Sequence, residues 1–467
     1  MGSVRAMAST RLLSSFNAKA AHATKTLARS GWSASLRRNA CSSPSALRSC
    51  MSAWVIDQYG TDGVLKYTEE MPVPSVGSTS EVLIRVHAAS LNPLDISMKG
   101  GYGAKLLNLR RDPMSVMAGA SEFPLVLGRD VSGEVVDCGS DVTHVVPGDE
   151  VWAAVPPWKQ GSLAEFVTLT EYEVSHKPKL LSHTEAASIP YVANTALSAL
   201  VNAGGLCRDS ASNKRVLITG ASGGVGTFSI QVRQSAFLQL CRRVCCCDCV
   251  YSCCLPLVCR QLLKAWGAHV TVTCSQNAEG LVRGLGADEV VDYTAGDSLE
   301  LLEMMEKFDV ILDNVGGETE EWATGLLKPW SGAKYVTLVS PLLLQTDSMG
   351  LLDGMLQAGL SLHNKAMQNI ISCGVFYRWG FYAPDGPALD EVSKLVDAGK
   401  ILPVVEAQFP FTQVPQAFQK VENGHARGKT VVRVVEDDDK RAEGLGRTRR
   451  SEAADSEQEE REMATQN

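Results

Sequence analysis

The sequence predicts an α/β protein with two domains, a β-rich one followed by a parallel sheet covered by helices. The chain has 467 residues, of which 45% are hydrophobic and 21% charged, a composition typical of a folded globular protein. Residues 54–169 contain short alternating strands separated by Gly and Pro, which indicates a compact, barrel-like β domain. After residue 190, strand-like runs alternate with segments of helical length, and this pattern predicts a parallel sheet wrapped by helices.

Each expected strand is a short apolar run bounded by turn residues. In the first domain the expected strands are residues 82–86, 133–136 and 150–153, with a Pro-Gly-Asp turn at 147–149. In the second domain they are residues 215–219, 269–274, 289–292, 308–313 and 334–339. We expect a last strand, at residues 430–435, to return to the first domain.

The two ends of the chain differ from its body in charge. Residues 1–50 contain two Lys, six Arg and no acid, and are rich in Ser and Ala, which is typical of a mitochondrial transit peptide and implies the matrix. Residues 436–467 are acidic and almost without large apolar side chains, so we expect a disordered tail. Between these ends we assign residues 51–190 and 376–435 to the β-rich domain and residues 191–375 to the parallel-sheet domain.

Charge and hydropathy exclude several classes of function. A net charge of −8 argues against general nucleic-acid binding. No uncharged apolar run reaches about 18 residues, so no transmembrane helix is expected. The 14 Cys are too few for a disulfide scaffold, and eight of them lie between Cys241 and Cys259.

A glycine-rich turn at residues 220–226 (Gly-Ala-Ser-Gly-Gly-Val-Gly) follows the first strand of the second domain. Its glycines at 220, 223 and 226 form a variant of the dinucleotide fingerprint, and the N-terminus of the following helix offers free amide groups to a pyrophosphate. The next strand ends in Cys274-Ser275-Gln276-Asn277, without the acid that would accept a hydrogen bond from a ribose 2′-hydroxyl. The sequence therefore predicts a dinucleotide cofactor and favours NADPH over NADH.

Residues 232–261 interrupt this unit. Gly226 and Ser275 stand 49 positions apart, where about 20 are expected. Without the insert the helix would continue from Gln231 to Leu262, with one apolar face formed by Val225, Phe228, Leu262 and Ala265. We hypothesise a retained intron or gene-model error. The alternative is a zinc knuckle built on the C-x-x-C pair Cys246 and Cys249.

The body resembles the zinc-free quinone oxidoreductase branch of the medium-chain dehydrogenase/reductase superfamily. The motifs that carry this resemblance are residues 90–95 (Ser-Leu-Asn-Pro-Leu-Asp), 128–135 (Gly-Arg-Asp-Val-Ser-Gly-Glu-Val), 161–165 (Gly-Ser-Leu-Ala-Glu) and the turn at 220–226. It implies a GroES-like first domain and a Rossmann-type doubly wound second domain. Zinc-dependent members carry Gly-His-Glu where this chain has Gly128-Arg129-Asp130, so the resemblance implies no metal.

The resemblance also implies which residues bind the cofactor. Ser222, Gly223, Gly224 and Val225 would hold the pyrophosphate, and Ser275 and Tyr293 would lie by the adenosine phosphate and ribose. Asn314 and Leu338 would follow the ribose and nicotinamide, and the far side would be closed by Gly380, Tyr382, Ala426, Arg427 and Gly428. Two of these have another interpretation, because Asn314 could simply form a turn and Arg427 could be a solvated surface charge.

Three residues are candidates for the catalytic cleft: Asn92, Asp95 and Tyr102. Tyr102 could donate a hydrogen bond to a carbonyl that is being reduced, although solvent can also supply the proton. Asn92 could instead shape the turn before Pro93, and Asp95 could cap a short helix.

The expected function is NADPH-dependent, zinc-independent reduction of quinones or related conjugated carbonyls. A narrower resemblance, carried by residues 313–317 and 424–430, implies a link to mitochondrial ubiquinone metabolism. It also implies contact with a reticulon-type membrane protein, which would allow association with the outer mitochondrial membrane. The alternatives are an enoyl-thioester reductase and an NADPH-binding interaction protein without turnover. The sequence does not decide whether the protein forms a homo-oligomer.

Overall fold

The computed structural model describes residues 49–61, 63–114, 121–206, 211–231 and 267–435. The chain divides into two units, Met1–Leu47 and Arg48–Asn467, and everything described belongs to the second. The insert at 232–261, with Cys246 and Cys249, and the expected acidic tail lie outside the described residues, as do residues 1–48 of the expected transit peptide. Of the rejoined helix, the structure describes only the part up to Gln231, and Cys50 of the expected leader already belongs to a strand. Within the described residues, no helix is both long and apolar enough to cross a membrane.

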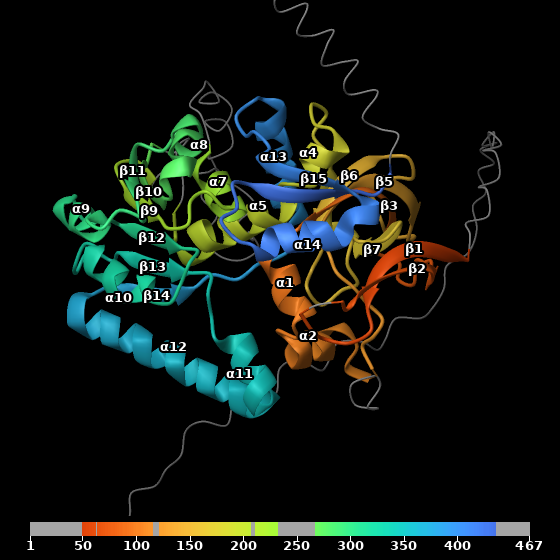
Figure 1. The fold of residues 1–467 in the computed structure, drawn as a ribbon, viewed down its shortest axis with the longest axis horizontal. Coiled ribbons are helices and arrows are strands. Elements are labelled where there is room, and N and C mark those ends of the chain that lie inside the picture. Colours follow the sequence, from red (N-terminus) through yellow and green to blue (C-terminus); the bar gives the residue numbers. More distant parts are fainter. Residues whose placement is uncertain (1–48, 62, 115–120, 207–210, 232–266, 436–467) are drawn as a thin grey trace, which may run out of the picture. The chain divides into compact units, whose positions relative to one another are not determined.

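A six-stranded, all-parallel sheet forms the second half of the fold (Figure 1). Its strands lie in the order β11 (Glu289–Asp292), β10 (His269–Cys274), β9 (Arg215–Ile218), β12 (Val310–Asp313), β13 (Lys334–Thr337) and β14 (Phe376–Trp379). After β9 the chain adds β10 and β11 on one side of it, and then crosses over to add β12, β13 and β14 on the other side. Such a reversal of strand order opens a crevice at the carboxyl ends of β9 and β12, where ligands bind in open α/β sheets.

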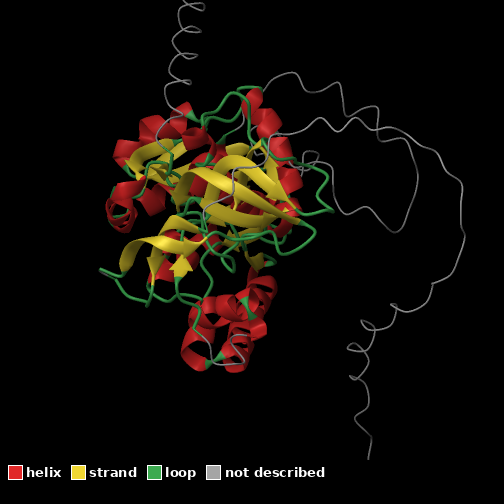
Figure 2. Ribbon diagram, turned by 90° about the vertical axis from the view of Figure 1, so that its right-hand side faces the viewer, coloured by secondary structure: helices red, strands yellow, loops and turns green. Residues whose placement is uncertain are grey.

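Both faces of this sheet are buried, as its sequence requires. Val216 and Ile218 of β9 pack into one apolar cluster, whereas Leu217 between them packs into another on the opposite face. Figure 2 shows helices flanking the strands. The helices of this half are α7 (Gly224–Ile230), α8 (Glu279–Gly284), α9 (Ser298–Met304), α10 (Thr319–Ala323), α11 (Leu342–Met349) and α12 (Leu351–Cys373), with 3₁₀ turns at Gln276–Ala278 and Thr324–Leu326. The expected doubly wound sheet is confirmed.

The first half is a β-rich body of two sheets. The larger runs in the order β15 (Val405–Pro410), β16 (Lys429–Arg433), β3 (Glu81–Leu91), β5 (Asp130–Cys138), β6 (Glu150–Ala154) and β8 (Val174–His176), with β7 (Phe166–Thr170) also paired to β3. The smaller consists of β2 (Leu65–Pro72), β1 (Cys50–Ile56) and β4 (Leu125–Val126). Its helices are α1 (Pro93–Lys99), α2 (Ala104–Arg111), α4 (His183–Ala186) and α14 (Val414–Glu422), with 3₁₀ turns at Glu171–Glu173 and Phe411–Gln413.

The two halves share elements at their junction. Helix α5 (Pro190–Leu197), which continues as a π-helical turn at Ser198–Ala203, packs with α13 (Gly386–Asp397) and with Phe228 of α7. Strand β16 returns to pair antiparallel with β3, as we expected for the last strand. The parallel sheet, however, extends past residue 375, because β14 pairs with β13. This edge strand lies at the start of the segment that we had assigned to the first domain.

Candidate functional site

The glycine-rich turn connects β9 to α7 at the crevice. Gly220 has a φ of +61°, a conformation that favours glycine and lets the chain reverse directly after the strand. A Cβ added to Gly226 would lie 2.5 Å from Ala221 Cα, so only glycine permits this approach of helix and turn. The turn therefore has two of the three backbone features that the fingerprint requires, the tight reversal and the close packing of the helix.

A segment from the far end of the chain is bound to this turn. The Gly428 N–H donates to the Ser222 carbonyl at 3.0 Å, and Gly223 and Gly428 form an isolated parallel bridge. Thus the expected pyrophosphate residues and the expected closing segment 426–428 lie together. Arg427 is held through its backbone N–H, which donates to Glu406 Oε2 at 2.9 Å, and its side chain stays half exposed.

At the crevice the Asn314 amide is held in one orientation. Its Nδ2 donates to the Thr219 carbonyl at 2.8 Å, and its backbone N–H donates to Thr219 Oγ1 at 3.1 Å. Its Oδ1 is buried and has no hydrogen-bond partner. A buried acceptor without a donor is costly, so this oxygen fits a ligand that brings an N–H or O–H group.

Asp313, which was not among the expected site residues, supports this arrangement. Its buried carboxylate accepts hydrogen bonds from Thr219 Oγ1 at 2.7 Å and from the Tyr335 hydroxyl at 2.6 Å. Its backbone carbonyl accepts from the Leu338 N–H at 3.0 Å. Leu338 in turn lies against Gly380, where an added Cβ would come within 3.0 Å of Leu338 Cδ2. The expected residues Asn314, Leu338 and Gly380 therefore lie next to one another, Asn314 through the adjacent Asp313 and Gly380 through its contact with Leu338.

Tyr382 stacks on Tyr191, which the sequence analysis also missed. The ring centroids are 4.6 Å apart and the rings are nearly parallel, at 7°. The Tyr382 hydroxyl donates to the Ala154 carbonyl at 3.1 Å. Burial raises the pKa of both tyrosines, so both stay protonated at neutral pH.

Ser275 and Tyr293 follow neighbouring strands, β10 and β11, and so lie near each other at their carboxyl ends. Ser275 Oγ donates to Asn277 Oδ1 at 2.6 Å, and Tyr293 is 49% exposed. An acid, Asp292, also stands at this edge. Hydrogen bonds from the Thr294 side chain and backbone to Asp292 Oδ1 lower the pKa of Asp292, so the carboxylate is charged at neutral pH.

Asn92 and Asp95 are buried and satisfied by the protein rather than open to a cleft. Asn92 Nδ2 donates to Asp130 Oδ2 at 2.9 Å, and Asn92 Oδ1 accepts from Lys429 Nζ at 2.6 Å. Asp95 is fully buried, accepts from the Asn92 and Gly128 backbone N–H groups, and lies 3.4 Å from Arg129 Nε. Burial raises the pKa of Asp95, and the Arg129 guanidinium opposes that rise. The acceptance from Asn92 N–H agrees with a capping role at α1.

Among the three expected cleft residues, all of which the structure describes, Tyr102 is the one whose side chain makes no hydrogen bond to the protein. It is partly buried at the end of the α1–α2 connection, next to Gly103, whose N–H donates to Asp347 Oδ2 at 2.6 Å. Burial raises the pKa of Tyr102, and the nearby Asp347 carboxylate raises it further. The phenol therefore stays protonated at neutral pH.

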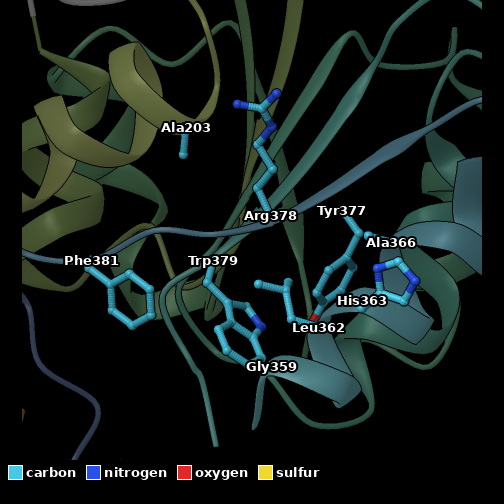
Figure 3. Close-up of a pocket in the computed structure, with 9 residues that line it drawn as sticks. All are labelled: Ala203, Gly359, Leu362, His363, Ala366, Tyr377, Arg378, Trp379 and Phe381. Atoms are coloured by element: carbon cyan, nitrogen blue, oxygen red, sulfur yellow. The ribbon is translucent and has the colours of Figure 1, made fainter. Parts of the chain in front are cut away.

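A cavity of about 500 Å³ lies between α12 and β14 (Figure 3). Its lining is mainly apolar and aromatic and includes Leu362, His363, Tyr377, Trp379 and Phe381, whereas the Arg378 side chain extends away from the rings. No expected site residue lines it, although Trp379 and Phe381 flank Gly380. The glycine turn, not this cavity, is where expected residues meet, namely residues 222–225, Gly428 and Asn314. Across the described ranges, no three His, Cys, Asp or Glu side chains are grouped to hold a metal.

Comparison with known proteins agrees with the fold. A family model described as an alcohol dehydrogenase GroES-like domain matches residues 78–179, and one described as a zinc-binding dehydrogenase matches residues 285–432. Among solved structures, the quinone oxidoreductase from Coxiella burnetii is similar with a TM-score of 0.61 and 26% identity, covering 83% of this chain and 100% of that one. The expected GroES-like and Rossmann-type domains are thereby confirmed.

Curated relatives are similar over most of the chain. The protein named NAD(P)H oxidoreductase RTN4IP1, mitochondrial, from Danio rerio is 58% identical over 392 residues, covering 84% of this chain and 93% of the relative. The Homo sapiens protein of the same name is 54% identical over 401 residues, covering 86% and 93%. These names confirm the mitochondrial location expected from the basic leader. The chain therefore belongs to the family of mitochondrial NAD(P)H oxidoreductases that includes RTN4IP1, within the medium-chain dehydrogenase/reductase superfamily.

Proposed function

We propose that the protein transfers hydride from NADPH to a quinone or a related conjugated carbonyl, with ubiquinone or a ubiquinone precursor as the physiological acceptor. The observation that carries this proposal is the glycine turn at the crevice, with segment 426–428 hydrogen-bonded to it and the unpartnered Asn314 Oδ1 beside it. These residues fit a dinucleotide, because the glycine turn lets the backbone approach a pyrophosphate closely and Asn314 Oδ1 can accept a hydrogen bond from another part of the cofactor.

The chain's own residues then have separate tasks. When bound, the reduced nicotinamide supplies the hydride and its two electrons. Residues 222–225 would hold the pyrophosphate, and Asn314 Oδ1 would accept from a ribose hydroxyl or carboxamide donor. Tyr102 would donate one proton to the acceptor oxygen and recover it from solvent, so hydride plus proton complete a two-electron reduction of quinone to hydroquinone.

We propose that no zinc takes part. Arg129 stands where zinc-dependent members carry a ligand, and its guanidinium donates to three backbone carbonyls of the first domain. A fully buried cation in that position opposes the binding of a divalent metal.

The conjugated-carbonyl acceptor has support from a more distant relative. The protein named 2-methylene-furan-3-one reductase from Solanum lycopersicum is 29% identical over 393 residues, covering 82% of this chain and 79% of the relative. Reduction of a conjugated enone differs from quinone reduction in that the proton goes to carbon. A Caenorhabditis elegans relative, 35% identical over 386 residues, is named Reticulon-4-interacting protein 1. We therefore also propose contact with a reticulon-type membrane protein.

The acceptor can be tested by stopped-flow loss of NADPH absorbance with short-chain ubiquinone analogues, conjugated enones and enoyl-CoA. We expect turnover with quinones, and a kcat about 10²-fold lower for Tyr102→Phe with unchanged NADPH affinity. The matched control is Tyr172→Phe, which alters an exposed ring and should change neither value. NADPH binding without turnover of any acceptor would refute the proposed reaction and favour an interaction protein.

Cofactor preference depends on Ser275 in this proposal. Ser275→Asp would place a carboxylate at the end of β10, where it repels a 2′-phosphate and accepts from a 2′-hydroxyl. We expect the Kd for NADPH to rise at least about tenfold and the Kd for NADH to fall, as measured by fluorescence titration. Ser275→Ala, which adds no charge, should weaken NADPH binding far less. Equal effects of both substitutions would show that this position does not select the cofactor.

A further inference from the structure

Lys429 is a buried cation that the proposed reaction does not use. Lys429 is only 5% exposed. It is the first residue of strand β16 and directly follows the segment bound to the glycine turn. Its Nζ donates to the Leu91 carbonyl at 2.8 Å, to Asn92 Oδ1 at 2.6 Å and to Asp130 Oδ2 at 3.2 Å. The three protons of the ammonium therefore have three acceptors, all of them in the first domain.

Asp130, which accepts a hydrogen bond from Lys429, also accepts hydrogen bonds from other elements of the fold. Its Oδ1 accepts from the Tyr191 N–H at the start of α5, at 2.6 Å. Its Oδ2 accepts from Ser90 Oγ and from Asn92 Nδ2. One fully buried carboxylate thus joins β3, the start of α1 and the start of α5, and Lys429 is the cation that directly pairs with it.

The aliphatic part of Lys429 contacts the cofactor turn. A Cβ added to Gly224 would lie 2.9 Å from Lys429 Cδ and 2.9 Å from Val192 Cγ1. Gly224 begins helix α7, so its backbone N–H is among those that we expect to bind the pyrophosphate. The same side chain therefore contacts the phosphate-binding backbone with its stem and Asn92 with its charged end.

We propose that Lys429 is a positioning residue that fixes the glycine turn relative to the Asn92 amide. The stem limits how the turn approaches the first domain, and the ammonium orients Asn92 and neutralises Asp130. This inference rests on the proposed function in placing the cofactor along the turn. It predicts that loss of the ammonium disturbs cofactor geometry beyond any loss of stability.

Three variants separate positioning from simple support of the fold. Lys429→Met keeps a long apolar stem against Gly224 but removes the charge. Lys429→Met combined with Asp130→Asn removes both charges and so relieves the uncompensated carboxylate. Lys429→Arg keeps a cation with different geometry. The matched control is Lys394→Met, which removes an exposed lysine on α13.

The measurements are thermal unfolding, NADPH affinity by fluorescence titration, and the single-turnover rate of hydride transfer. For Lys429→Met we expect lower thermal stability, about tenfold weaker NADPH binding and about tenfold slower transfer, since a hydrogen bond to a charged group is lost. The double variant should recover part of the stability, because the uncompensated charge is gone although residue 130 loses one of its two accepting oxygens. It should not recover affinity or rate, because Asn92 Oδ1 still lacks the lysine donor. Lys429→Arg should recover part of the stability and part of the NADPH affinity and transfer rate. Lys394→Met should match the wild type in all three.

Recovery of stability, affinity and rate together in the double variant would overturn the inference, as would Lys429→Met with wild-type affinity and rate. If the wild type binds NADPH but reduces nothing, the proposed reaction fails while the inference is still judged by affinity. Hydrogen exchange of the amides at 222–226 gives an independent readout, and we expect faster exchange in Lys429→Met with NADPH bound. Unchanged exchange at those amides would contradict the positioning role.

Discussion

Gly226→Ala should weaken NADPH binding by about 10- to 100-fold and lower the free energy of unfolding by about 1–3 kcal/mol. The added methyl group would stand 2.5 Å from Ala221 Cα and 2.6 Å from the Ala221 carbonyl oxygen. These are backbone atoms, so the overlap can be relieved only by moving helix α7 away from the turn. Such a shift displaces the amide groups that are expected to meet the pyrophosphate. Fluorescence titration with NADPH and chemical denaturation measure the two effects.

Gly280→Ala is the matched control, because Gly280 also lies inside a helix but an added Cβ would meet nothing within 4 Å. There the usual helix preference for alanine should stabilise the fold by about 0.5–1 kcal/mol and leave cofactor binding unchanged. The two substitutions are chemically identical, yet Gly226→Ala should lower the free energy of unfolding and Gly280→Ala should raise it. If both stabilised the protein, the close approach at Gly226 would not be a constraint on the turn.

Local sequence patterns predicted the parts of the fold that local structure decides. The expected strands at residues 269–274 and 289–292 coincide with β10 and β11, and the other expected strands of the parallel sheet overlap β9, β12 and β13. Parallel strands buried on both faces appear in a sequence as continuous apolar runs between turn residues, so they can be recognised without their partners. The expected strands at 215–219 and 334–339 extend one and two residues past the ends of β9 and β13.

Strands with mixed polarity escaped prediction. β14 reads Phe-Tyr-Arg-Trp and alternates in exposure, and only its pairing with β13 identifies it as the sixth strand. β2 reads Leu-Lys-Tyr-Thr-Glu-Glu-Met-Pro and is largely exposed, so its own composition gives little signal. Edge and surface strands owe their conformation to neighbours that lie far away in the sequence.

The same division applies to the site. The turn at 220–226 could be predicted because its glycines act within seven residues. Lys429 could not, because the residues that accept its hydrogen bonds lie between 299 and 338 positions away. Asp95 appeared to be a cleft residue from its motif, whereas the structure buries it completely against Arg129. Burial is a property of the whole fold, and a motif alone does not determine it.

Arg129→Met should destabilise the protein by about 3–5 kcal/mol, which is the range for removing one partner of a buried ion pair. Arg129 is fully buried, and its guanidinium lies 3.4 Å from Asp95 Oδ1. Its Nη1 donates to the Pro156 and Lys159 carbonyls, and its Nη2 donates to the Val126 carbonyl. Methionine fills similar volume but satisfies none of these acceptors, and it leaves Asp95 with a charge that burial already disfavours. Chemical denaturation measures the loss.

Three further variants identify the cause. Arg129→Lys keeps the charge but offers one compact group where the guanidinium reaches three carbonyls, so we expect an intermediate loss. Arg129→Met with Asp95→Asn removes the uncompensated carboxylate and should recover part of the stability. Arg283→Met breaks an exposed pair with Glu279 on α8, where both side chains are more than 40% exposed, and should cost less than about 0.5 kcal/mol. If Arg129→Met cost no more than this control, Asp95 and the three carbonyls would have to find other partners, and the buried guanidinium would not be what holds the first domain together at this position.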